Sequence, residues 1–142
     1  MYEEKINAYF DAPERRAELV EAISRLVRIR SVREEPLPGM PFGPGPAAVL
    51  AEGLKLAEEL GFATRNYDNY VGTADLNDKE TALHILCHLD VVGEGTGWTV
   101  TEPYVPKEVD GMLYGRGTDD DKGPVAAVLL AMKAVKELGV PL

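Results

Sequence analysis

The 142-residue sequence predicts an α/β fold in which a mixed sheet is flanked by helices. Three segments carry apolar residues at helical spacing, and the segments between them alternate or run apolar as strands do. Hydrophobic residues make up 45% of the chain and charged residues 27%, close to the globular average. We therefore expect an ordered domain with a hydrophobic core.

The first two predicted helices flank a loop. Residues 14–29 have apolar side chains at helical spacing, and Pro13 lies where helices tend to start. Residues 33–46 hold five of the ten prolines and three glycines, which predicts a loop. Residues 47–60 form the second predicted helix, which ends at Gly61.

Strands are expected in the middle of the chain. Residues 62–76 predict two short strands around a turn at Asp68-Asn69. Residues 81–90 are apolar on both faces except at their C-terminal end, a pattern typical of a central strand. This segment is therefore the predicted centre of the sheet.

A hairpin and a helix complete the predicted elements. Residues 103–117 predict a hairpin that turns at Asp110-Gly111. The last helix begins near Gly123-Pro124, with proline in the first turn, and runs to about Leu138. Gly139 follows it as a typical helix end.

Charge and cysteine content exclude several classes of partner. The net charge of −9 argues against binding nucleic acid or an anionic membrane, since both require a basic surface. The N-terminus lacks the basic and apolar pattern of a secretory signal, and no apolar run is long enough to span a bilayer. The single cysteine, Cys87, fits a reducing compartment, so we expect a cytoplasmic protein.

His88 and Asp90 form the first candidate for chemistry. Two residues apart on a predicted strand, they leave the same face, where the apolar run gives way to a glycine-rich loop. A histidine there could ligate zinc while a nearby carboxylate holds its other ring nitrogen. A hydrogen-bonded core histidine followed by a turn aspartate is the simpler interpretation.

The second candidate is the stretch YGRGTDDDKGP, residues 114–124. Three adjacent carboxylates repel one another unless they are solvated or bind a cation. The phosphate-loop, dinucleotide and EF-hand patterns all fail here. A solvated turn, with Asp121 or a neighbour capping the last helix, is the simpler interpretation. Taken together, the two clusters offer the histidine and carboxylates that a zinc site needs.

The two stretches, HLDVV…GW from His88 to Trp98 and YGRGTDDDKGP, resemble the N-terminal signatures of the M20 metallopeptidases. The pattern is most similar to the PepV-type dipeptidases within that family. The resemblance implies a zinc-exopeptidase-like catalytic domain. Residues 1–142 would form its N-terminal part, and the rest of the catalytic domain and a lid domain would be absent.

The resemblance also implies individual roles. His88 would be a terminal ligand of one zinc ion. Asp90 would orient His88 and counts among the family's catalytic residues, and Asp120 would bridge two zinc ions. A cis peptide is implied between Asp120 and Asp121, whereas Asp119 and Asp121 receive no ligand role.

The family's remaining site residues are absent from this sequence. Relatives carry a Glu-Glu pair that supplies the general base and a ligand, then a further acidic ligand and a C-terminal histidine. No Glu-Glu pair follows the acidic stretch here, and the sequence has no third histidine. We therefore expect a fragment of a longer enzyme that is inactive alone and self-associates through exposed apolar surface.

The implied activity of the parent protein is zinc-dependent hydrolysis of dipeptides by a metal-activated water. An N-acyl-amino-acid deacylase of the same family is the first alternative, because this segment discriminates weakly between substrates. A non-catalytic domain that binds a metal or a partner is the second.

Overall fold

A computed structural model describes residues 2–141 and confirms the α/β class. Met1 and Leu142, the ends of the predicted domain, lie outside the described residues. The elements in chain order are α1 (Tyr2–Phe10), α2 (Pro13–Val27), α3 (Pro44–Glu59), β1 (Ala63–Tyr67), β2 (Val71–Asp75), β3 (Lys107–Val109), β4 (Met112–Tyr114) and α4 (Lys122–Glu137). The three predicted helices are confirmed with ends shifted by a few residues, and α1 is a further helix that the sequence patterns did not predict.

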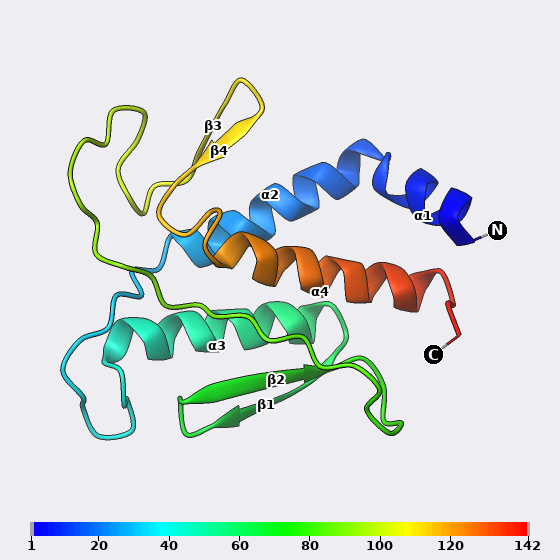
Figure 1. Cartoon of the computed structure of the whole chain (residues 1–142), viewed down its shortest axis with the longest axis horizontal. Helices are drawn as coiled ribbons and strands as arrows, with labels where there is room; N and C mark the ends of the chain where they lie inside the picture. The colour runs from blue at the N-terminus through cyan, green and yellow to red at the C-terminus, as the bar shows by residue number, and fades with distance from the viewer. Residues whose placement is uncertain (1, 142) are drawn as a thin grey trace.

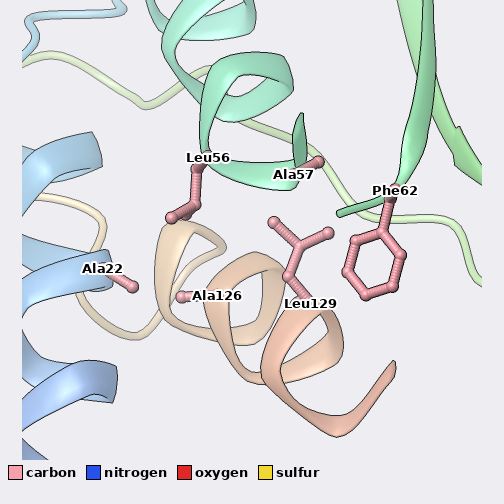
Figure 2. Close-up of a cluster of buried hydrophobic side chains, with 6 residues drawn as sticks. All are labelled: Ala22, Leu56, Ala57, Phe62, Ala126 and Leu129. Carbon is pink, nitrogen blue, oxygen red and sulfur yellow. The ribbon is translucent and has the colours of Figure 1, made fainter. Parts of the chain in front are cut away.

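The core lies between the three longer helices. Helices α2 and α4 lie side by side, and α3 packs against α2 and carries the first hairpin on its other side (Figure 1). Figure 2 shows the cluster at their meeting point, with side chains from all three helices and from Phe62, directly before β1. Its members are Ala22, Leu56, Ala57, Phe62, Ala126 and Leu129. Burial of this apolar surface supplies the main driving force for the arrangement.

Both predicted hairpins are confirmed as two-stranded antiparallel sheets. Strand β1 pairs with β2, and β3 pairs with β4. The turn residues Asp68 and Asn69 have φ angles of 53° and 59°, and Asp110 and Gly111 have φ angles of 51° and 79°. Positive φ at both central residues matches the right-handed twist of the flanking strands, which explains the choice of Asp, Asn and Gly.

The prediction of a central strand at residues 81–90 is wrong for the described chain. These residues belong to no strand, and the run crosses beside α3 as an irregular segment (Figure 1). Leu83, Ile85 and Leu86 are 74%, 56% and 91% exposed. A strand needs a neighbour to satisfy its backbone N–H and C=O groups, and the described residues place none beside this segment.

Within residues 2–141, no helix is both long and apolar enough to cross a membrane. The segments that carry the candidate site residues converge near the N-terminal end of α4, at the edge of the helical layer (Figure 1).

Candidate metal centre

The structure brings His88, Asp120 and Asp121 together, with one potential ligand atom of each within 4.8 Å of the others. His88 Nε2 lies 2.9 Å from Asp120 Oδ1, although the two residues are 32 positions apart in the sequence. His88 Nδ1 lies 3.1 Å from the Asp90 carbonyl oxygen and 3.3 Å from Asp90 Oδ1. His88, Asp90 and Asp120, the three residues that the sequence singled out, therefore lie together in the structure.

The imidazole of His88 faces an oxygen at each ring nitrogen. A neutral imidazole has one N–H, so it can donate to Asp90 or to Asp120 but not to both. If Nδ1 donates to Asp90, the lone pair of Nε2 points at the Asp120 carboxylate. A proton or a metal ion on Nε2 removes the repulsion between this lone pair and the carboxylate. Imidazole and carboxylates together are a set of ligands that zinc accepts. The residues present therefore fit a metal ion.

The surroundings of His88 raise its pKa above 6.5. Desolvation by burial, the largest single influence, favours the neutral ring and opposes the shift. The hydrogen bond to the Asp90 carbonyl and the negative charges of Asp90, Asp120 and Asp121 outweigh it. A proton and a metal ion therefore compete for this imidazole.

Asp121 is the site residue that sequence reasoning missed. Its carboxylate accepts a hydrogen bond from the His88 backbone N–H at 3.0 Å. Although Asp121 occupies the N-cap position of α4, its side chain makes no cap hydrogen bond, so the interpretation as a helix cap is wrong. The peptide bond between Asp120 and Asp121 is cis, as the family resemblance implied.

The loop that carries the aspartates is closely packed against its own backbone. The Lys122 N–H donates to the Gly117 carbonyl at 3.0 Å, and the Thr118 hydroxyl donates to the Gly115 carbonyl at 3.1 Å. A side chain at Gly123 would place its Cβ 2.1 Å from the Thr118 carbonyl oxygen. Glycine is therefore required at position 123 for the loop to close onto α4.

Glu94 connects the loop after Asp90 to its neighbours. Its carboxylate accepts hydrogen bonds from Arg30 Nε at 2.5 Å and from the Tyr104 hydroxyl at 2.9 Å. Its carbonyl oxygen accepts from Trp98 Nε1 at 2.8 Å and from Arg116 Nη2 at 2.9 Å. The backbone N–H of Glu94 itself, the Arg30 guanidinium and the Tyr104 hydroxyl lower the pKa of this carboxyl to about 2.

Two open cavities flank Arg116. One, of about 260 Å³, is lined by His88, by residues 90–92 and by residues 115–120. The other, of about 300 Å³, is lined by residues 94–100 with Tyr114 and Arg116. The candidate metal centre therefore opens to solvent, and a second cavity, lined in part by Trp98, lies beside it.

Lys122, directly after the aspartates, is a buried cation. Its side chain is 0% exposed, and Nζ donates to the Ile29 carbonyl at 2.7 Å. Desolvation lowers the pKa of this ammonium to about 8, because burial disfavours the charged form. The described residues provide no carboxylate in contact with it.

The lowered pKa of Lys122 predicts that the stability of the metal-free chain depends on pH. In the unfolded chain Lys122 has its ordinary pKa of 10.5, above the folded value. Between the two pKa values only the unfolded chain holds the proton. The free energy of unfolding should therefore rise with pH by at most about 1.4 kcal/mol per pH unit between about pH 8 and pH 10.5. Urea unfolding of the wild-type chain and of Lys122→Met, each with a chelator, measures the difference; parallel curves would contradict the prediction.

Comparison with known proteins adds an independent observation. Residues 84–142 match Peptidase family M20/M25/M40. The matched range contains His88, Asp90, Asp120 and Asp121. The family match therefore covers both candidate motifs.

Curated relatives are similar over nearly the whole chain. The protein named "Putative dipeptidase YtjP" from Bacillus subtilis (strain 168) is 38% identical over 130 residues, which is 90% of this chain and 28% of the relative. "Putative dipeptidase SSP1012" from Staphylococcus saprophyticus is 36% identical over 142 residues, or 99% of this chain and 29% of the relative.

A solved structure is also similar. The crystal structure of human carnosine dipeptidase 1 superposes with a TM-score of 0.70 and 28% identity, covering 98% of this chain and 32% of that one. The chain thus spans less than a third of the length of each of these three proteins.

Proposed function

We propose that this chain is the N-terminal part of an M20-family metallo-dipeptidase. The observation that carries the proposal is the meeting of His88 with Asp120 and Asp121 from a segment more than 30 residues away. The match to the M20 family over these residues and the two curated relatives support it. The sequence features that resemble PepV-type dipeptidases are our reason for choosing that branch.

In this proposal His88 and Asp120 hold a divalent cation, and Asp121 stands beside them as a further carboxylate. Asp90 orients His88, because an oxygen at Nδ1 leaves Nε2 free to face the cation. A cation bound there supplies Lewis acidity toward a carbonyl oxygen and acidifies water. We propose zinc, two ions in the complete enzyme, since imidazole and carboxylate ligands suit it.

We further propose that the complete protein continues beyond this chain with the rest of the catalytic domain and a lid domain. The lengths of the relatives support this, as do the exposed apolar side chains of Leu83, Ile85 and Leu86. An extended apolar segment with unpaired backbone groups readily pairs with another strand. By the same reasoning, the 142-residue chain alone should self-associate. The single cysteine supports our proposal of a cytoplasmic location.

The test is an assay of the purified natural protein. We expect it to hydrolyse dipeptides, to lose this activity with a metal chelator and to regain it when Zn²⁺ is added back. N-acetyl amino acids are assayed alongside, and the 142-residue chain alone is expected to be inactive. Preferential cleavage of N-acetyl amino acids would identify a deacylase instead. Metal binding without hydrolysis of either substrate would favour a non-catalytic metal-binding domain.

A further inference from the structure

Three residues that follow the C-cap of α2, Arg28, contact both segments that carry the candidate ligands. We call these residues, Ile29, Arg30 and Ser31, the strut. The Ser31 hydroxyl donates to the carbonyl oxygen of Leu89 at 2.7 Å, and the Ser31 carbonyl accepts from the Val91 N–H at 3.2 Å. Leu89 lies between the two residues that bear the imidazole and its orienting carboxylate. The strut therefore holds the backbone of that segment from both sides of Asp90.

The other end of the strut contacts the loop that bears the aspartates. The Ile29 carbonyl accepts from Lys122 Nζ at 2.7 Å, and Lys122 follows Asp121 directly. Between these contacts, Arg30 donates to the Glu94 carboxylate at 2.5 Å, farther along the first loop. Consecutive residues of the strut thus bind the two ligand segments, which are otherwise distant in sequence.

The strut is held rigidly by the core. It continues from the last turn of α2, where Leu26 and Val27 are both 0% exposed, and Ser31 is itself 0% exposed. The start of α3 packs directly against the strut. A Cβ at Gly45 would lie only 2.2 Å from the Arg30 carbonyl oxygen. A backbone segment packed this closely on both sides has little freedom to move.

We propose that Ser31 is a positioning residue, which sets the place of His88 and Asp90 relative to Asp120 through the strut. The inference rests on the proposed metal site and adds a residue that contacts no ligand side chain itself. Without the Ser31 hydroxyl, the carbonyl of half-buried Leu89 loses its donor, and the segment that bears His88 is released from the strut at that point. The ligand geometry then relaxes while the core stays intact.

The test is made in the natural full-length protein with Ser31→Ala. Loss of groups that orient metal ligands costs roughly 10-fold to 100-fold in metal affinity, and we expect a roughly 10-fold loss of Zn²⁺ affinity, measured against a competing chelator. The absorption spectrum of bound Co²⁺, which reports ligand geometry, should change as well. Ser31→Cys, which keeps a weaker donor of similar shape, should fall between wild type and Ser31→Ala.

Ser24→Ala is the matched control, since Ser24 is another buried serine, 5% exposed, on α2. It should leave Zn²⁺ affinity and the Co²⁺ spectrum unchanged, whatever its effect on the melting temperature. Unchanged affinity and spectrum in Ser31→Ala would overturn the inference alone. A wild-type protein that binds neither ion would overturn both the metal site and the inference. Weakened binding in Ser31→Ala, in a protein that does not hydrolyse dipeptides, would support the inference and overturn the proposed activity.

Discussion

Replacing Asp120 with asparagine in the natural protein is expected to lower dipeptide hydrolysis by more than about 100-fold, since groups that only orient metal ligands already account for losses of that order. The substitution keeps the size of the side chain and removes the charge that faces His88 Nε2 at 2.9 Å. Zn²⁺ affinity should fall with the activity. Initial rates with saturating dipeptide and a metal titration measure the two effects.

Asp119→Asn is the control for this experiment. It makes the same chemical change one residue earlier, on an exposed side chain outside the cluster of potential ligand atoms. A much smaller loss of activity than in Asp120→Asn is expected, because Asp119 lines the same cavity but is not among the potential ligands. Equal losses in both variants would show that the negative charge of the loop matters and that Asp120 has no special position. A fully active Asp120→Asn variant would contradict the proposed role of Asp120 as a metal ligand.

Gly123→Ala is expected to destabilise the 142-residue chain by about 1–3 kcal/mol, the range for forcing an extra methyl group into a closely packed site. The new Cβ would lie 2.1 Å from the Thr118 carbonyl oxygen, so the loop or the first turn of α4 must move. Because Asp120 and Asp121 lie between these two residues, Zn²⁺ affinity of the natural protein should fall too. Urea unfolding and a metal titration are the measurements.

Gly93→Ala tests whether this effect is specific to position 123. Gly93 lies on the loop after Asp90, its φ is outside the left-handed region, and a Cβ there meets nothing within 4 Å. The free energy of unfolding of the Gly93→Ala variant should stay within about 0.5 kcal/mol of wild type, as for surface substitutions generally. If Gly123→Ala is equally harmless, the contact with Thr118 does not constrain the loop.

Local patterns predicted most of the secondary structure. Helices α2, α3 and α4 follow from apolar spacing with proline at or near their starts, and these signals lie within a few residues of each other. The two hairpins follow from turn residues that tolerate positive φ. Residues 81–90 had the composition of a buried strand, but pairing depends on a neighbour that local composition does not supply.

The candidate site likewise combines residues that the sequence selects with contacts that depend on the tertiary structure. The spacing of His88 and Asp90 and the glycine-flanked aspartates mark two candidate clusters, and the resemblance to the M20 family selects Asp120 among the three aspartates. Through local patterns and that resemblance, the sequence by itself therefore determined α2, α3 and α4, the two hairpins and three of the candidate site residues. Only the tertiary structure placed Asp121 against the His88 backbone and Ser31 against Leu89. Those contacts join residues 33 and 58 positions apart, and hydrogen bonds at such separations depend on how the helices pack.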